Sequence, residues 1–240
     1  DGNSITSFDG IDFDGVLALI GGPVSVASNG STLSFGGAVT GTQDLTLDAL
    51  AGGAGTVTGL EQIGFNSTLT GLAVTAHTLS LPSTGLAVAG PMSFTAAAGI
   101  TLNGAVGNSA GPATGEIDFV GPVALATGAI AVTTADANII FNGTVDDAQA
   151  LTLDAGTGNI SFAGAVGSDV PLASLVTAAN STVLLTGGSI ETAGAQTYSG
   201  DVTLGADATL TGVNVQFDGT LNGGHALVVN NSGATVFNDV

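Results

Sequence analysis

The sequence predicts an all-β fold, namely a parallel β-helix (β-solenoid) of about 12 coils with a period near 20 residues. Three observations lead to this prediction. A short phrase with an aromatic residue, a glycine and an aliphatic residue returns along the chain. Apolar Ala, Val, Leu and Ile alternate with Thr, Ser, Asn and Gly in the period-two pattern of strands. Helix-forming surface residues are almost missing, since the chain has no Lys or Arg and only Glu61, Glu116 and Glu191.

The repeated phrase reads Phe-x-Gly-x-Val in its clearest copies, with weaker copies that start at Leu102 and Phe119. From Leu102 onward, most intervals between successive starts are close to the predicted period. The interval between Phe162 and Tyr198 is almost twice as long, and we interpret it as two short units with one blurred copy. We expect the aromatic and aliphatic members of the phrase to form the repeat core. These residues are Phe35, Val39, Phe119, Phe141, Val145, Phe162, Val166, Tyr198, Val202, Phe217, Leu221 and Phe237.

The expected strands are short and separated by Gly, Asn, Asp and Ser, which favour turns. In the first half of the chain they are Val24–Ala27, Thr32–Phe35, Asp44–Asp48, Leu69–Ala76, His77–Leu81, Ile100–Leu102 and Glu116–Val120. In the second half they are Ile130–Thr133, Asn138–Phe141, Leu151–Asp154, Asn159–Phe162, Ser174–Thr177, Thr182–Thr186, Gln196–Tyr198, Val202–Leu204, Thr209–Thr211, Val213–Phe217, Leu227–Val229 and Thr235–Phe237.

A second phrase, at residues 44–49, recurs at 150–155 and more loosely at 226–230. We expect its copies to define the register between coils more closely. Two or three short strands per unit, with turns between them, describe one coil of a parallel β-helix. Inward Leu, Val and Phe would stack on like residues from coil to coil, and outward Thr and Asn would form ladders. A single coil cannot bury its own apolar face, so such a fold is stable only as a stack.

The charge balance excludes several classes of partner. The chain carries 19 acidic residues and no Lys or Arg, for a net charge of −19. Nothing in it can neutralise phosphate, so we expect no nucleic-acid partner and no attraction to anionic lipid.

No apolar run approaches the length of about 18 residues that a membrane helix needs, so we expect no membrane insertion. The chain has no cysteine, so core burial and backbone ladders must hold the fold without disulfides.

No linker divides the chain, and its six prolines are scattered, several of them next to glycine. We therefore interpret residues 1–240 as one continuous β-solenoid segment. Repeat-like residues occur near both ends, at 8–11 and 237–240, and no signal peptide is visible. We expect the segment to be an interior piece of a longer chain.

Two stretches carry a resemblance to a known family. Residues 151–167 read LTLDAGTGNISFAGAVG, and residues 194–211 read GAQTYSGDVTLGADATLT. They resemble the β-strand repeats of giant bacterial surface proteins, the filamentous-haemagglutinin-like and related large adhesins, and the likeness covers roughly residues 100–240. The resemblance implies a right-handed β-helical shaft, secretion to the cell surface, and a role in adhesion or filament formation. It implies no binding residue, because the shaft repeats of that family have no defined site.

One short motif invites a catalytic interpretation. Residues 107–111 fit the G-x-S-x-G pattern of a nucleophile elbow, which needs a strand-to-helix turn. No helical pattern follows Gly111, and the available bases, His77 and His225, lie in no recognisable context. A glycine-rich corner explains the motif better, and we expect no enzymatic activity.

Acidic residues near the start of the chain form the one candidate metal site. Asp9, Asp12 and Asp14 could supply carboxylates to Ca²⁺, although their spacing is not that of an EF-hand loop. Asp146 and Asp147 are a second, weaker pair. The competing interpretation is that these are turn aspartates that accept hydrogen bonds from backbone N–H groups. We expect no other cofactor than loosely bound Ca²⁺.

The leading functional hypothesis is a structural shaft or filament-forming segment of a secreted bacterial surface protein, which continues or self-associates end to end. Open coils would expose unpaired strand edges, which favour such stacking. The alternative is an adhesin module that recognises a cell-surface glycan or protein through a lateral face. Aromatic side chains usually build sugar-binding faces, and the chain has one Tyr and no Trp, while its Phe residues fit inward positions.

Overall fold

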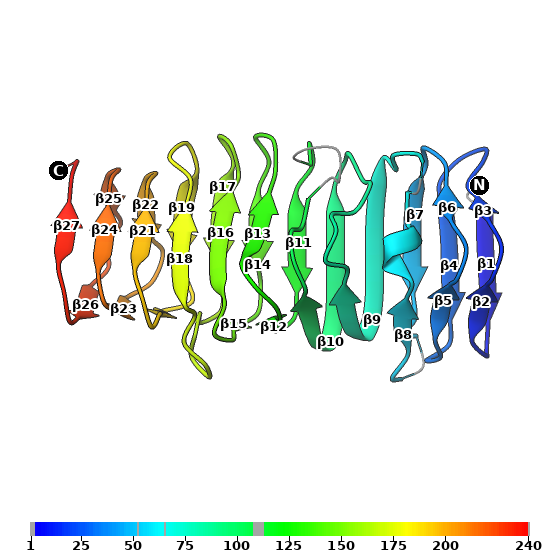
Figure 1. The fold of residues 1–240 in the computed structure, drawn as a ribbon, viewed down its shortest axis with the longest axis horizontal. Helices are drawn as coiled ribbons and strands as arrows, with labels where there is room; N and C mark the ends of the chain where they lie inside the picture. Colours follow the sequence, from blue (N-terminus) through cyan, green and yellow to red (C-terminus); the bar gives the residue numbers. More distant parts are fainter. Residues whose placement is uncertain (1–2, 52, 65, 108–112, 240) are drawn as a thin grey trace.

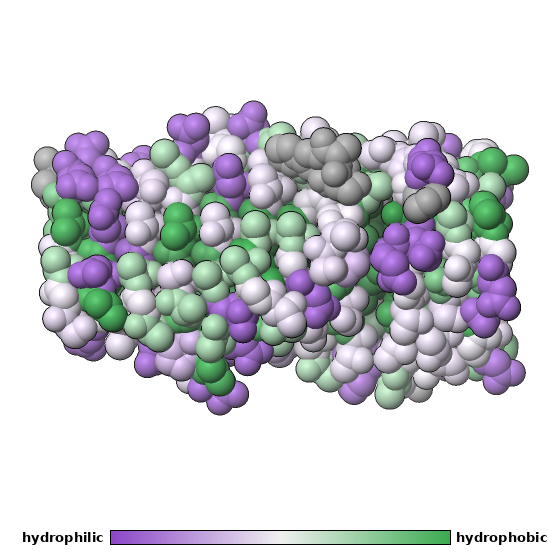
Figure 2. All heavy atoms as spheres, in the orientation of Figure 1, coloured by the Kyte–Doolittle hydropathy of each residue, from purple (hydrophilic) through white to green (hydrophobic). Residues whose placement is uncertain are grey.

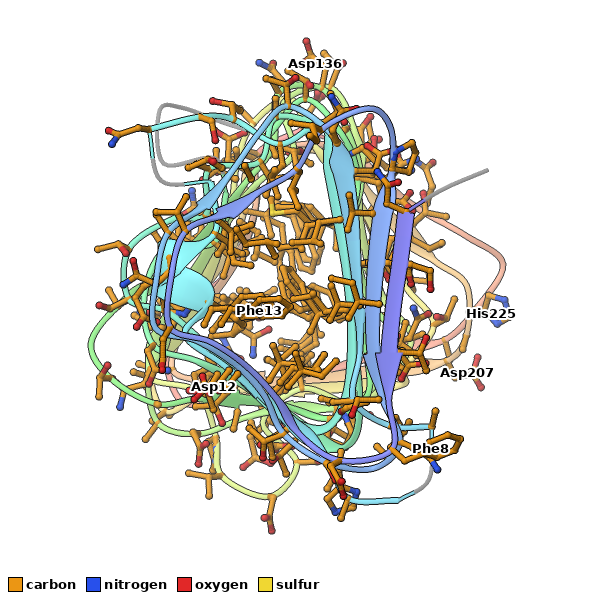
Figure 3. The ribbon with its side chains drawn as sticks, turned by 90° about the vertical axis from the view of Figure 1, so that its right-hand side faces the viewer. Phe8, Asp12, Phe13, Asp136, Asp207 and His225 are labelled. Carbon is orange, nitrogen blue, oxygen red and sulfur yellow. The ribbon has the colours of Figure 1, made fainter. Side chains whose placement is uncertain are left out.

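A computed structural model describes residues 3–51, 53–64, 66–107 and 113–239 and shows one stack of parallel strands (Figure 1). The chain winds through about 11 turns with a period near 21 residues, which confirms the predicted β-solenoid. Figure 3 looks onto the N-terminal end, where the chain runs clockwise as it recedes, so the solenoid is right-handed. The helical content of the described residues is a 3₁₀ turn, η1 (Leu60–Gln62). Among these residues, no helix has the length and apolar character to cross a membrane.

The strands of successive coils lie on three faces of the stack, and some coils have no strand on the third face. The first face holds β1 (Asn3–Ser7), β4 (Val24–Ser28), β7 (Asp44–Asp48), the first parts of β9 (Gly71–Leu81) and β10 (Met92–Leu102), β11 (Ile117–Val120), β14 (Ile139–Phe141), β17 (Asn159–Phe162), β19 (Thr182–Leu185), β22 (Val202–Leu204) and β25 (Leu221–Asn222). The second face holds β2 (Ile11–Phe13), β5 (Leu33–Phe35), β8 (Thr56–Thr58), the second parts of β9 and β10, β12 (Val123–Leu125), β15 (Val145–Asp146), β20 (Ser189–Glu191), β23 (Ala208–Gly212) and β26 (Leu227–Asn231). The third face holds β3 (Leu17–Ala18), β6 (Val39–Thr40), β13 (Ile130–Thr133), β16 (Ala150–Asp154), β18 (Ser174–Thr177), β21 (Gln196–Tyr198), β24 (Val215–Phe217) and β27 (Thr235–Phe237).

The core is a set of rows in which inward side chains stack from coil to coil. Within a strand such as β4 the side chains alternate between buried and half-buried, as a strand with one face on the core must. On the second face, one inward row runs through Leu33, Val57, Leu79, Ile100 and Val123, and all five are buried. Full burial of such a side chain contributes about 1.5–3 kcal/mol, so the rows are the main source of stability.

The repeated aromatic phrase does not keep one position in the coil. It leads from the first face to the second at Phe141 and Phe162, and from the second to the third at Phe35. It leads from the third face to the first at Tyr198 and Phe217. The phrase therefore marks a corner, and each of the three corners of the solenoid uses it somewhere along the stack.

The interpretation of the long interval between Phe162 and Tyr198 as two short coils is consequently wrong. Phe162 pairs with Leu185, its neighbour in the next coil on the first face. Tyr198 instead pairs with Thr177, on the third face. The physical reason is that all three corners need the same chemistry: an inward aromatic or aliphatic residue, a glycine where backbones approach closely, and an inward residue that starts the next strand.

The second phrase also changes its place. Residues 44–48 form β7 on the first face, residues 150–154 form β16 on the third, and residues 227–231 form β26 on the second. It identifies strands correctly but does not fix a common register, because inward and outward residues alternate in the same way on every face.

Most differences from the expected strands concern length. The two strands expected at 69–76 and 77–81 are one continuous strand, β9, and the strand expected at 100–102 is the end of β10, which starts at Met92. Several strands that the sequence did not indicate have only two or three residues: β2, β3, β6, β8, β12, β15, β20 and β25. A two-residue strand is too short to show a period of two, so its alternation cannot be detected.

The terminal coils expose residues that point inward elsewhere. Ile5 of β1 is 39% exposed, whereas Val26, its neighbour in β4, is buried. Phe237 of β27 is 43% exposed, although it stacks on the buried Phe217. Each of these strands pairs with one neighbour among the described strands, and its other edge is open at the end of the stack (Figure 1).

Candidate functional site

Of the twelve residues predicted to form the repeat core, ten are buried. Leu221 is only half-buried and Phe237 is exposed, since both lie in the last coil and lack a coil above them. The structure does not gather the twelve into one row but divides them among the three faces, according to the corner at which each copy of the phrase lies.

The aromatic members of the core form three separate stacks. The longest runs along the first face through Phe94, Phe119, Phe141 and Phe162, with successive ring centroids 5.7, 4.9 and 5.4 Å apart. A second stack, on the third face, joins Tyr198, Phe217 and Phe237 at 5.2 and 5.1 Å. The third pairs Phe13 with Phe35 at 5.2 Å on the second face, and its Phe13 end is seen in Figure 3. Phe13 and Phe94, which the sequence did not single out, therefore extend the aromatic core.

Glycines stack at the corner beside the longest aromatic row. Gly121, Gly143, Gly164 and Gly187 occupy this corner in four consecutive coils. A Cβ atom on Gly143 would lie closer than 3.0 Å to the backbone carbonyl of Gly121, and one on Gly164 would meet the carbonyl of Gly143 in the same way. The glycine of the repeated phrase is thus required by the close approach of successive coils.

Many corner carboxylates accept hydrogen bonds from the next coil. The Thr220 backbone N–H and hydroxyl both donate to Asp201 Oδ1 at 2.8 Å. The Thr157 backbone N–H and hydroxyl donate to Asp136 Oδ1 at 2.8 and 3.0 Å. The Ala226 backbone N–H donates to Asp207 Oδ1 at 2.9 Å. In these three examples the aspartate connects two successive coils, in addition to the backbone ladder.

The acid stability of the stack tests these connections. The Thr220 hydroxyl and N–H lower the pKa of Asp201 below its ordinary value of 3.8. A carboxylate with a lowered native pKa contributes stability above its unfolded pKa and loses it as the pH falls through the native value. We expect the wild-type chain to exceed Asp201→Asn in stability at pH 7 in urea unfolding, and the difference to close below about pH 3.8.

Glu191→Gln provides the control for this prediction, because Glu191 is exposed and makes no side-chain hydrogen bond to the described residues. It reports the general effect of removing one of the 19 negative charges. If the two variants show the same pH dependence, the hydrogen bonds to Asp201 do not stabilise the fold.

The predicted Ca²⁺ ligands do not converge. Asp12 lies outward on β2, where its Oδ1 accepts a hydrogen bond of 2.6 Å from the Ser34 hydroxyl of the next coil. The backbone N–H of Asp9 bonds to Ser7 Oγ at the preceding corner, and Asp14 follows β2. No three His, Cys, Asp or Glu side chains of the described residues lie close enough together to hold a metal ion, so these three aspartates form no such group. Asp146 accepts a hydrogen bond from the Asp169 backbone N–H.

The G-x-S-x-G motif lies mostly outside the described residues, since only Gly107 of residues 107–111 is among them. Its two candidate bases are far apart along the stack. His77 belongs to β9, in the first half of the chain, whereas His225 lies between β25 and β26 in the last coil. His225 Nδ1 is 3.5 Å from Asp207 Oδ1 on the outer surface, where Figure 3 shows both side chains.

A buried polar cluster interrupts the apolar core where the second aromatic stack begins. The Tyr198 hydroxyl donates to Gln196 Oε1 at 2.9 Å, and Gln196 Nε2 donates to the Thr211 carbonyl at 2.8 Å. Both side chains are fully buried, and burial raises the pKa of Tyr198. Next to Tyr198 in the row is Thr177, whose buried hydroxyl has no hydrogen-bond partner in the described part of the chain. No sequence signal indicates a polar core at Gln196, because the residue follows the inward period of an ordinary strand.

The surfaces of the stack differ in character. Figure 2 shows the third face, where pale and green residues cover much of the area and purple ones are scattered. The first face lies on the opposite side and carries a groove of about 310 Å³ across β7, β9, β10 and β11. Asp44, Glu116 and Asp118 line this groove together with Gly71, Ala73 and Ser93. It is a lateral hollow in a regular face. Asp44, Leu45 and Thr46, from the first copy of the second repeated phrase, line one end of it.

The fold places the chain in the class of parallel β-solenoid proteins. No known protein family, curated protein or solved structure matches it. The geometry of the chain itself therefore carries the functional conclusions.

Proposed function

We propose that the chain is a structural shaft or filament-forming segment of a secreted bacterial surface protein. It acts by β-helical stacking and has no catalytic role. The observation that supports this proposal is the pair of open ends. Within the described residues, the first and last coils present strand edges without a pairing partner around the exposed ends of apolar rows, such as Ile5 and Phe237. Such edges readily pair with further strands, and a further coil, from the same chain or from a second copy, would bury both features.

The cell-surface location rests on different observations. One is the likeness of residues 151–167 and 194–211 to repeats of large bacterial adhesins. Another is the absence of Lys and Arg, which leaves trypsin-like proteases no cleavage site and suits an exposed extracellular chain. The alternative role, recognition of a glycan or another cell through a lateral face, would be tested by a glycan-array screen of the chain.

Self-association of the isolated chain tests the stacking role. We expect sedimentation velocity at about 0.15 M salt, where the Debye length is about 8 Å, to show species that grow with protein concentration. Electron microscopy should show rods of constant width. Phe237→Asp places a charge at the open end of an apolar row and should abolish growth.

Val176→Asp is the matched control for this experiment. Val176 is exposed to a similar extent, 38% against 43% for Phe237, but it lies on the lateral third face. We expect it to leave growth unchanged, with both variants folded as judged by circular dichroism. A wild-type chain that stays monomeric at all concentrations would contradict end-to-end stacking.

A further inference from the structure

The groove on the first face arises from small outward side chains in two adjacent coils. Along one outward row, Thr46 is followed by Ala73, Ser93 and Asp118. In the neighbouring row, Asp44 pairs with Gly71, which has no side chain. Larger residues thus stand at both ends of a floor made by β9 and β10, and the hollow between them has a volume of about 310 Å³.

Both ends of the groove are acidic, and each carboxylate is held in place. The Thr70 hydroxyl donates to Asp44 Oδ1 at 2.5 Å at one end. At the other end the Asn138 amide donates to Glu116 Oε2 at 3.0 Å, and the Asn142 amide donates to Asp118 Oδ1 at 2.7 Å. Each bond engages one oxygen and fixes the orientation of the carboxylate.

The charge at the Glu116 end is poorly compensated. Partial burial and the neighbouring Glu116 carboxylate raise the pKa of Asp118, against the effect of its hydrogen bond to Asn142. The chain has no Lys or Arg that could neutralise this pair. A cation from outside would relieve the repulsion between the two carboxylates.

We propose that this groove binds a linear polyamine, with one terminal ammonium group at Asp44 and the other at Glu116 and Asp118. The methylene chain would lie along the floor at Gly71 and Ala73. Asp44 and Glu116 are three coils apart, about 14 Å at about 4.8 Å per coil, which suits an extended ligand and not a single ion. A metal ion fits less well, because the described residues contain no group of three metal-ligating side chains.

Calorimetric titration of the whole chain with spermidine tests the proposal. We expect saturable binding of one spermidine per groove at about 0.15 M salt, where the general attraction of a charged surface is screened. Butylamine, which carries one ammonium group, should bind at least about tenfold more weakly, as the loss of one charge-assisted contact predicts. Binding without saturation, or equal binding of butylamine, would overturn the proposal.

Two variants separate the groove from the overall charge. Glu116→Gln with Asp118→Asn removes the charges at one end, and Ala73→Leu fills the floor while keeping every carboxylate. Each should weaken spermidine binding about tenfold or more. The control, Glu61→Gln with Glu191→Gln, changes the net charge by the same two units at exposed positions elsewhere and should keep the affinity within about twofold. A comparable loss in the control, or no loss in Ala73→Leu, would assign the binding to diffuse electrostatic attraction.

Discussion

Phe141→Ala is expected to destabilise the stack by about 3–5 kcal/mol, the usual cost of removing a buried aromatic side chain. Phe141 is fully buried and lies between Phe119 and Phe162, with ring centroids 4.9 and 5.4 Å away. The substitution leaves a cavity and also removes two aromatic contacts. The midpoint of urea unfolding, followed by circular dichroism, measures the effect.

Phe237→Ala is the control within the same kind of row. Phe237 is 43% exposed and stacks on one ring, that of Phe217, at 5.1 Å. Its loss should cost less than about 1.5 kcal/mol, because water already reaches one side of the ring. Equal costs for Phe141 and Phe237 would show that the interior of the stack is not packed more tightly than its end.

Gly143→Ala should destabilise the protein by about 3 kcal/mol, at the upper end of the usual cost of overpacking. The added methyl group would meet three backbone atoms of Gly121 and Pro122 at 2.8 Å or less. Backbone cannot turn away as a side chain can, so the two coils must separate at this corner. The same urea titration measures the change.

Gly224→Ala tests whether the effect comes from the close approach of the coils. A Cβ atom on Gly224 would meet no atom within 4 Å, and its backbone does not adopt a positive φ. Its unfolding midpoint should stay near that of the wild type, within about 0.5 kcal/mol. A large loss of stability here would mean that glycine is needed for its conformational freedom and not for space.

The fold class was predictable because the two patterns that indicate it, the alternation of inward and outward residues and the repeated corner phrase, can each be seen within a short segment. Strands such as β4, with Val24 and Val26 inward, show alternation within one short segment. The placement of each phrase was not predictable, because the choice of face depends on the length of each coil. The coil that joins Leu45 to its partner Leu72 is much longer than the one that joins Val183 to Val202.

The candidate sites also differ in whether they can be recognised within one segment or only from the register between coils. The inward aromatic residues could be identified from their own phrase, and ten of the twelve predicted core residues are buried. The polyamine groove could not, because it depends on the register between Asp44 and Gly71, which belong to successive coils. The connection between Asp201 and Thr220 also needs the register, since a turn aspartate looks the same in sequence whether it bonds within its coil or to the next one.

The ladders that join successive coils run along the long axis of the stack (Figure 1). A pull on the two ends therefore acts along the N–H···O bonds, and not across them as in a sheet that is sheared. Because each coil contacts mainly its neighbours, the outermost coil peels away while the remaining coils keep their packing. Under tension the chain would therefore unfold coil by coil, in about 11 small extensions. A sudden load would be dissipated over these steps before the whole stack unfolded.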